Sequence, residues 1–283
     1  MPNHIRPRRS MLYVPGDKPR ALEKARSLPC DGVILDLEDA IAPENKAVAR
    51  AGIAEAVGAG FGGREVILRV SAAGCVEDIA LADSLPIHGV LIPKVESAET
   101  VGTLRSRHPV WCMIETPLGV LRAAEIAAAG AAGLVVGTND LAKDLRARHT
   151  PDRTPLLTSL SLILLAARAH GLAALDGVHL ALDDLAGFEA SCVQGVELGF
   201  DGKTLVHPST IDIANRVFGP SEPEVAKARA IVAAWEAARA EGKGVARIGG
   251  AMVEQLHVDE ALRLIAMAEE IGSSGQDPQS GSG

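Results

Sequence analysis

The sequence predicts an α/β protein whose core is a closed (β/α)₈ barrel (TIM barrel), followed by a C-terminal extension of helices and a hairpin. Eight short apolar runs recur along the chain, separated by helical segments rich in Ala, Glu, Lys and Arg. The runs are continuous rather than alternating, which is typical of parallel strands covered on both faces. An open doubly wound sheet is the structural alternative, but it needs fewer strands, and no GxGxxG motif follows the first run.

The predicted strands are spaced so that a helix fits between most neighbours. They are SMLYV (10–14), GVILDL (32–37), EVILRV (65–70), GVLIP (89–93), VWCMIE (110–115), GLVVG (133–137), GLAALD (171–176) and GVELGF (195–200). PRALEKARSL and SAETVGTLRSR are examples of the helical segments between them. The longest gap, before the seventh strand, holds the polar loop RARHTPDRTP and then a helix, LLTSLSLILLAARAHG.

A further segment follows the eighth strand and is not needed to close a barrel. It contains TIDIANRVFG, the helix EPEVAKARAIVAAWEAARAEG and a second helix around VDEALRLIAMAEEIG. The Gly-rich stretch GKGVARIGGAMVEQ between those two helices is a candidate hairpin. We therefore expect a barrel over residues 1–220, an extension over 221–272 that is a candidate lid for a neighbouring subunit, and a disordered Gly/Ser tail over 273–283.

Composition argues against several classes of function. A formal net charge of -8 disfavours a sequence-independent nucleic-acid binder, which needs a basic surface. The four cysteines form no CxxC pair, so we expect reduced thiols rather than disulfides or a zinc site. No apolar run reaches the ~18 residues of a membrane span, and no signal-peptide apolar region follows the basic start. A cytoplasmic protein without nucleic-acid or membrane partners is expected.

Charged residues gather at the predicted carboxyl ends of the strands, where barrels of this kind place their active sites. They are Asp17, Asp36, Glu38, Asp39, Arg69, Lys94, Glu115, Asp140, Asp176, Asp201 and Lys203. Mg²⁺ prefers one or two carboxylates, completed by water and ligand oxygens. We therefore predict Glu115 and Asp140, from adjacent strand ends, as Mg²⁺ ligands. Glu38 and Asp39 could orient the metal's water molecules, and Arg69 could grip a substrate carboxylate.

Each assignment has a structural alternative. A charged residue after a strand is most often a solvated loop residue. Asp140 could cap the helix LAKDLRA, and Glu38 and Asp39 could cap the helix that follows them. Arg69 could be a structural ion-pair partner. Only the joint pattern favours the functional interpretation.

At these residues the chain resembles the citrate lyase beta-subunit family, within the larger group of bacterial aldolases that includes malyl-CoA and citramalyl-CoA lyases. The resemblance covers most of the chain, and two of its blocks are highly specific. The similar blocks are RRSMLYVPGDKPRALEKA, DGVILDLEDAIAPENKAVAR, VLIPKVES, MIETPLGVLRAAEIA, VGTNDLAKDL and GFDGKTLVHPSTIDIANRVFGPSEPEVAKA. The second and last of these are the specific ones.

The resemblance implies roles for residues that match the family's motifs. Glu115 and Asp140 match its Mg²⁺ ligands, and Arg69 matches the arginine that binds the substrate's carboxylate and carbonyl end. Glu38 and Asp39 match its acidic pair near the metal's water molecules. Lys18, Arg20 and the region of His207 and Pro208 lie where relatives bind the CoA portion. His207 could equally be a structural histidine.

The chain departs from the family's pattern at two places. Ser71 stands where relatives often have Asn after the strand-three arginine. Glu254 stands where relatives usually present an aspartate to a neighbouring subunit's active site as the acid/base. The extra methylene moves the carboxylate by about 1.5 Å, and a misplacement of ~1 Å can cost on the order of 10²-fold in rate. Glu254 could also be an exposed hairpin residue.

The resemblance implies a Mg²⁺-dependent carbon–carbon lyase. It would cleave a 3-hydroxyacyl thioester such as citryl-, malyl- or citramalyl-CoA to a 2-oxo acid (oxaloacetate, glyoxylate or pyruvate) and an acetyl thioester. In that reaction Arg69 binds the acid and Glu254 protonates the enolate. Two alternatives use the same site: a malyl-CoA thioesterase, and a non-catalytic subunit that binds Mg²⁺ and oxaloacetate. A homotrimer is expected, because Glu254 would act across a subunit boundary.

Overall fold

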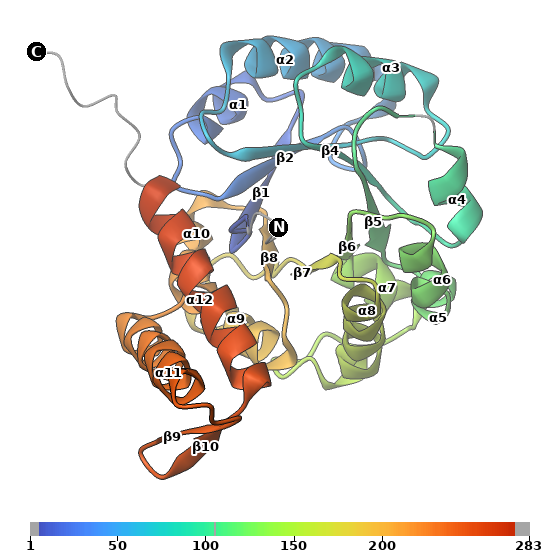
Figure 1. Cartoon of the computed structure of the whole chain (residues 1–283). Helices are drawn as coiled ribbons and strands as arrows, with labels where there is room; N and C mark the ends of the chain where they lie inside the picture. Colours follow the sequence, from blue (N-terminus) through green and yellow to red (C-terminus); the bar gives the residue numbers. More distant parts are fainter. Residues whose placement is uncertain (1–5, 105, 275–283) are drawn as a thin grey trace, which may run out of the picture. The chain divides into compact units, whose positions relative to one another are not determined.

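The computed structural model describes residues 6–104 and 106–274. The chain divides into two compact units, one of residues 8–218 and one that combines the N-terminal residues before Arg8 with those from Gly219 onward. The larger unit is a closed barrel of eight parallel strands in which β1 pairs with both β2 and β8 (Figure 1). The strands are β1 (Ser10–Pro15), β2 (Gly32–Asp36), β3 (Glu65–Arg69), β4 (Gly89–Ile92), β5 (Val110–Ile114), β6 (Gly133–Val136), β7 (Ala173–Asp176) and β8 (Gly202–Leu205). The predicted (β/α)₈ barrel is confirmed.

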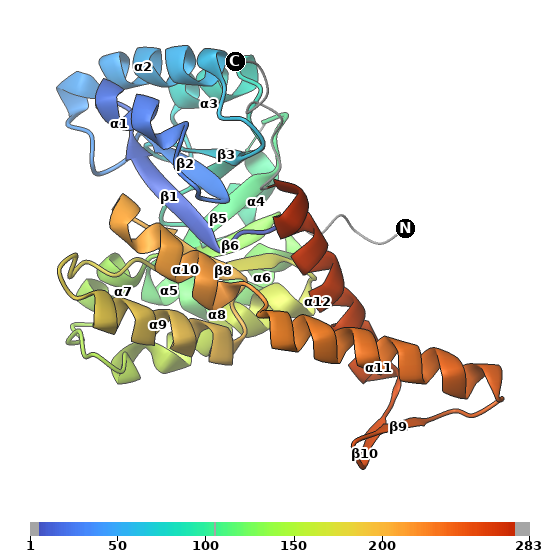
Figure 2. The same cartoon turned by 90° about the vertical axis from the view of Figure 1, so that its left-hand side faces the viewer.

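Helices follow the strands and surround the barrel (Figure 2). They are α1 (Pro19–Ala25), η1 (Pro43–Asn45), α2 (Lys46–Ala59), α3 (Val76–Ser84), α4 (Ala98–Thr103), α5 (Pro117–Leu121), α6 (Ala123–Ala128), α7 (Thr138–Asp144), η2 (Thr154–Leu156), α8 (Leu157–Ala169), α9 (Leu185–Leu198), η3 (Pro208–Thr210) and α10 (Ile211–Phe218). Their apolar faces pack on the outward side chains of the strands, for example Ile53 with Leu35 in one cluster and Leu160 with Leu134 in another. Each such burial contributes roughly 1.5–3 kcal/mol.

A separate cluster fills the inside of the barrel. It consists of Met11, Ile34, Ile67, Leu91, Trp111, Met113, Val135 and Leu175. Trp111 is the bulkiest member, and glycines begin the two flanking strands at Gly89 and Gly133. A Cβ added at Gly133 would lie 2.3 Å from the Trp111 ring, so the indole leaves no room for a side chain there. This packed layer supports the side chains that lie above it.

The eighth predicted strand is wrong. Residues 195–200 form the end of α9 and its cap, and β8 follows at Gly202–Leu205. Gly199 adopts a left-handed conformation with φ 104°, and the N–H groups of Gly199 and Phe200 donate to the Gly195 carbonyl at 3.1 and 2.9 Å. This is a glycine helix cap, whose flanking apolar residues imitate a short strand. The true strand, GKTL, was hidden because it contains a buried lysine, Lys203.

The smaller unit includes helix α11 (Glu222–Ala240), strands β9 (Ala246–Ile248) and β10 (Ala251–Val253), and helix α12 (Gln255–Ser274). The two strands pair antiparallel, so the Gly-rich stretch does form a hairpin. Helix α12 continues two residues into the expected tail, and residues 275–283 lie outside the described part of the chain. No helix within the described residues is long and apolar enough to cross a membrane.

Candidate active site

A cavity of about 340 Å³ opens at the carboxyl ends of the barrel strands. Its lining includes five predicted residues, Glu38, Asp39, Arg69, Glu115 and Asp140. The remaining lining residues are Tyr13, Pro15, Asp36, Ala40, Met113, Val136, Gly137, Thr138, Asn139, Val178, Leu180, Thr204 and Val206. The barrel therefore brings together all the predicted metal and acid-binding residues.

Strand periodicity explains why several polar residues point into this cavity. Successive side chains of a strand alternate between its two faces, so residues two apart share a face. Four polar residues of the cavity each follow a member of the inner barrel cluster by two positions: Tyr13, Asp36, Arg69 and Glu115. These four residues form the layer above the inner cluster.

Glu115 lies directly after β5 and is 4 % exposed. One carboxylate oxygen, Oε1, accepts a hydrogen bond of 2.8 Å from the backbone N–H of Lys94. A Cβ at Gly137 would lie 2.4 Å from the other oxygen, Oε2, so glycine makes room for the carboxylate. Asp140 stands in the first turn of α7 and accepts no helix-capping bond, since Gly137 occupies the N-cap position. The capping alternative for Asp140 is thus not observed.

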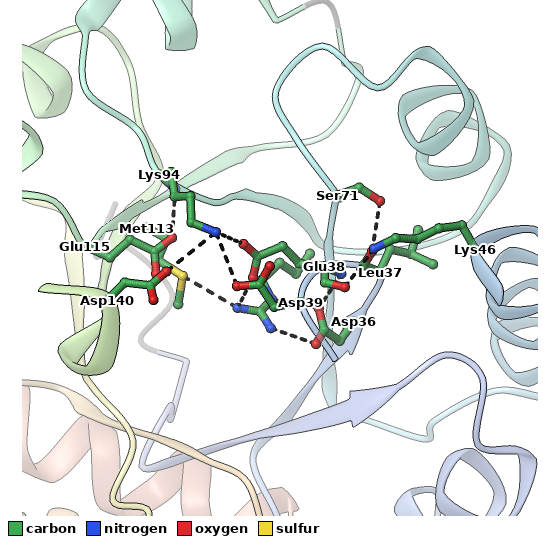
Figure 3. A network of polar contacts seen from close by, with 11 residues as sticks. Asp36, Leu37, Glu38, Asp39, Lys46, Ser71, Lys94, Met113, Glu115 and Asp140 are labelled. Atoms are coloured by element: carbon green, nitrogen blue, oxygen red, sulfur yellow. Dashed lines mark hydrogen bonds and ion pairs between the residues drawn. The ribbon is translucent and has the colours of Figure 1, made fainter. Parts of the chain in front are cut away.

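Lys94 links the acidic residues of the site (Figure 3). Its ammonium lies 2.7 Å from Glu38, 3.2 Å from Asp39 and 3.5 Å from Asp140. Its backbone adopts the left-handed region with φ 52°, which costs a non-glycine residue roughly 1–2 kcal/mol. Lys94 thus contacts Glu115 through its backbone N–H and Glu38, Asp39 and Asp140 through its ammonium. Glu38 and Asp39 do not cap the following helix.

Arg69 ends β3 and is held by two carboxylates. Its Nε and Nη2 each donate to Asp36 at 2.7 Å, and its Nη1 lies 2.8 Å from Glu38. Burial opposes the charged form, but the hydrogen bonds that Arg69 donates to Asp36 and the nearby negative charges, Asp36 and Glu38 among them, together outweigh it and raise the pKa of Arg69 above its ordinary value. The structural alternative for Arg69 is correct in that the residue forms ion pairs, and its place in the cavity lining keeps it available to a ligand.

Glu115 is the acid whose protonation the site perturbs most clearly. Burial, with smaller contributions from Glu38 and Asp140, raises the pKa of its carboxyl from 4.5 to about 7, while the Lys94 N–H opposes the rise. Carboxylates outnumber Arg69 and Lys94 in this cluster. A divalent cation between Glu115 and Asp140 would neutralise that excess.

This pKa predicts a pH dependence of stability in the metal-free protein. Between pH 4.5 and about 7 the folded chain holds the Glu115 proton while the unfolded chain has released it. The free energy of unfolding should therefore fall as pH rises through that window, by roughly 3 kcal/mol. Glu115→Gln lacks this titration, so urea unfolding in EDTA should show the variant gaining stability relative to wild type as pH rises. Parallel pH profiles for the two proteins would contradict the assignment.

The predicted CoA-binding residues are less clearly placed. Lys18 and Arg20 are exposed at the start of α1, and neither belongs to the described lining of the cavity. His207 is exposed and caps η3 by accepting from the Ser209 N–H at 3.2 Å, which favours its structural role. Glu254 follows β10 in the smaller unit and is exposed. The roles of these residues stay predictions.

A family model described as HpcH/HpaI aldolase/citrate lyase matches residues 9–208, which include the whole barrel wall and the cavity. The chain belongs to this family. The resemblance found in the sequence to citrate lyase beta subunits is thereby confirmed.

Members of the family that resemble the chain carry two kinds of name. A (3S)-malyl-CoA thioesterase of Cereibacter sphaeroides (strain ATCC 17025 / ATH 2.4.3) is 46% identical over 97% of this chain and 99% of its own. Citrate lyase subunit beta of Leuconostoc mesenteroides subsp. cremoris is 34% identical over 94% of this chain and 95% of its own. The chain therefore belongs to a family of enzymes that includes both thioesterases and lyase subunits.

Solved structures of the family share the fold. CitE from Mycobacterium tuberculosis, in complex with magnesium, acetoacetate and coenzyme A, matches with a TM-score of 0.77 at 32% identity, covering 92% of this chain and 98% of that chain. A citrate lyase beta subunit from M. tuberculosis complexed with oxaloacetate and magnesium matches with a TM-score of 0.67 at 32% identity, over 76% of this chain and 98% of that one.

Three charged positions expected at the mouth lie elsewhere in this family member. Asp176 and Lys203 are cross-strand partners that point outward from the barrel, next to α9, where Asp176 also binds Arg153. Asp201 precedes β8 at the opposite end of the strand and pairs with Arg168. The end of a strand is visible in the sequence, but the face on which its last residue lies depends on the register.

Sequence reasoning missed the roles of Tyr13, Asp36 and Lys94. Asp36 and Lys94 were recognised only as charged strand ends, although both contact the predicted site residues directly. Tyr13 is the chain's single tyrosine, two residues after the inner-cluster Met11. That spacing is the signal that could have identified it as a residue facing the cavity.

Proposed function

We propose that Glu115 and Asp140 bind Mg²⁺ and that the chain hydrolyses a short 3-hydroxyacyl-CoA thioester such as (3S)-malyl-CoA. The main support is the extent of similarity to the named malyl-CoA thioesterases, 46% identity over 97% of the chain. The alternative of thioester hydrolysis at this site is thus favoured over the lyase reaction that the sequence blocks suggested.

The donor set suits Mg²⁺. Among the described residues, no three His, Cys, Asp or Glu side chains form a ready metal cluster, so two carboxylates would have to suffice. Mg²⁺ characteristically accepts one or two protein carboxylates and takes its other ligands from water and substrate oxygens. The excess of negative charge around Glu115 fits a divalent cation. When bound, Mg²⁺ supplies charge neutralisation and polarises substrate oxygens.

The chain's own residues account for binding and proton transfer in this proposal. Arg69 binds the substrate's carboxylate, and Lys94 keeps Glu38, Asp39 and Glu115 in position. Lys18 and Arg20 hold the CoA portion outside the cavity. In hydrolysis, Glu254 takes a proton from water as the oxygen attacks the thioester carbonyl; the carbon–sulfur bond then breaks and Glu254 returns the proton to the leaving CoA thiolate.

Carbon–carbon cleavage is the second candidate. The observation that favours it is the 34% identity to citrate lyase subunit beta over 94% of the chain. In this reaction a general base takes the hydroxyl proton, and the bond between the hydroxyl-bearing carbon and the thioester's α-carbon breaks. Its electron pair goes to the thioester enolate, which protonated Glu254 then protonates. The same cavity and the same Arg69 contact serve both reactions.

Product analysis separates the candidates. Purified chain is incubated with (3S)-malyl-CoA and Mg²⁺, and free thiol and glyoxylate are both measured. Hydrolysis releases free CoA thiol and malate, whereas cleavage yields glyoxylate and acetyl-CoA without free thiol. Glyoxylate without thiol would overturn the hydrolase proposal in favour of the lyase. Binding of Mg²⁺ and oxaloacetate without turnover of malyl-, citramalyl- or citryl-CoA would identify a non-catalytic subunit.

Glu254 is predicted to act on a neighbouring chain's barrel within a homotrimer. Glu254→Gln and Glu115→Ala should each lose at least ~10²-fold in turnover, the scale of a missing acid/base or metal ligand. Co-expressed together, the two variants should regain activity, because a Glu254 from one chain can meet an intact barrel of the other. A chain carrying both substitutions is the control. A co-expressed mixture as inactive as each variant alone would contradict action across subunits.

A further inference from the structure

One edge of the Arg69 guanidinium forms an ion pair with Asp36. The two residues are cross-strand partners of β2 and β3, and their side chains form a two-pronged ion pair with both distances at 2.7 Å. Asp36 is 2% exposed, and the Arg69 side chain is 13% exposed. Such a paired geometry fixes the plane of the guanidinium as well as its position.

A count of donors shows what remains for a ligand. A guanidinium has five N–H bonds, and Asp36 accepts one from Nε and one from Nη2. Nη1 also forms an ion pair with Glu38, at 2.8 Å. One N–H on each Nη atom remains; that of Nη1 donates to the Met113 sulfur at 3.8 Å, a weak acceptor that a carboxylate oxygen can replace. Arg69 lines the cavity, so these two N–H groups are the ones available to a ligand there.

The Tyr13 ring packs against the face of the Arg69 guanidinium. The guanidinium carbon of Arg69 lies 4.6 Å from the centroid of the Tyr13 ring, a cation–π contact. The Tyr13 hydroxyl is buried and has no hydrogen-bond partner among the described atoms. The contact to Arg69 is therefore made by the ring and not by the hydroxyl. Three neighbouring strands thus supply the ring, the carboxylate and the guanidinium.

We propose that Asp36 and Tyr13 are positioning residues that hold Arg69 with its two remaining Nη hydrogens ready for one carboxylate group of the substrate. The inference rests on the proposed function, in which Arg69 binds the acid. A fixed pair of donors matches two anionic oxygens in one plane. An amide offers one oxygen and a repelling NH₂ group instead, so the site should discriminate between these two groups.

The test measures the affinities of pyruvate and pyruvamide by calorimetry in the presence of Mg²⁺. The two compounds differ only in that one has a carboxylate and the other an amide. Wild type should bind pyruvate more tightly than pyruvamide. Asp36→Asn should reduce the ratio of the two affinities by about 10-fold or more, because a hydrogen bond to a charged group contributes at least that factor to affinity. Asp78→Asn is the matched control, because Asp78 is equally buried and paired with an arginine, Arg50, but lies outside the cavity lining. It should keep the wild-type ratio.

Tyr13 provides a second pair of variants. Phe retains the ring and removes only the unpartnered hydroxyl, whereas Leu removes the ring. Tyr13→Leu should therefore lower the affinity ratio by about 3-fold or more relative to Tyr13→Phe. This pair also tests the proposal if Asp36→Asn does not fold.

Three outcomes would overturn the proposal: folded Asp36→Asn that keeps the wild-type ratio, Phe and Leu variants of Tyr13 with equal ratios, or wild type that binds both compounds alike. Calorimetry needs no thioester turnover. A protein inactive on malyl-CoA that still shows the expected shifts would retain the positioning roles while refuting the proposed activity.

Discussion

Replacing Glu115 by Gln is expected to abolish Mg²⁺-dependent binding of oxaloacetate and to lower turnover by more than about 100-fold. Loss of a residue that only contacts a metal's ligands costs up to about that factor, so loss of a ligand itself should cost more. Gln keeps the size of the side chain and one acceptor for the Lys94 N–H, which is 2.8 Å away. The loss would therefore report the missing charge and not a collapse of the site. Asp140→Ala should have the same effect, since a carboxylate pair loses one of its two members.

The matched control is Glu65→Gln. Glu65 is also buried, at 3% exposed, and paired with Arg8, but it begins β3 and so lies at the opposite end of the barrel from the cavity. It should lose stability without losing Mg²⁺-dependent binding. Binding is measured by calorimetry with and without EDTA. If Glu115→Gln and Asp140→Ala both bind oxaloacetate as wild type does, the metal assignment is wrong.

Seven strands could be predicted because each is a continuous apolar run buried on both faces. The eighth could not, because its Lys203 is tolerated only through a tertiary contact with Asp176, 2.7 Å away, that local sequence does not reveal. The glycine cap at Gly199 then supplied a false strand close by. The fold class was still predicted correctly, because a barrel is predicted from the repeat of strand–helix units and not from any one of them.

The predicted site residues were found as charged strand ends, which the sequence displays directly. Their contacts could not be found in this way. The left-handed backbone of Lys94 and the ring of Tyr13 beneath Arg69 both depend on neighbouring strands. Register also decides the face, and it separates Asp36, which points inward, from Asp176, which points outward. A charged residue at a strand end is therefore only a candidate site residue until the register of its strand is known.

Asp176 is expected to be the most important single carboxylate for stability. It is fully buried, and it accepts hydrogen bonds from Lys203 at 2.7 Å, from Arg153 at 2.7 and 2.8 Å, and from the Gly177 N–H at 2.8 Å. Burial alone would raise its pKa, but the charges of Lys203 and Arg153 hold it below the ordinary value. The carboxylate is therefore ionised and neutralises the buried Lys203 and the part-buried Arg153.

Asp176→Asn should lower the free energy of unfolding by about 3–5 kcal/mol, because it leaves those cations uncompensated in the interior. Asp201→Asn is the matched control: its ion pair with Arg168 is part-exposed, at 26% and 42%, and should contribute only about 1 kcal/mol or less. Urea unfolding at neutral pH measures both. Adding Lys203→Met to Asp176→Asn should restore part of the loss, because an apolar side chain needs no counter-charge there. Equal losses in the two single variants would mean that the buried ions are not coupled, and that α9 is held on the barrel by its apolar contacts alone.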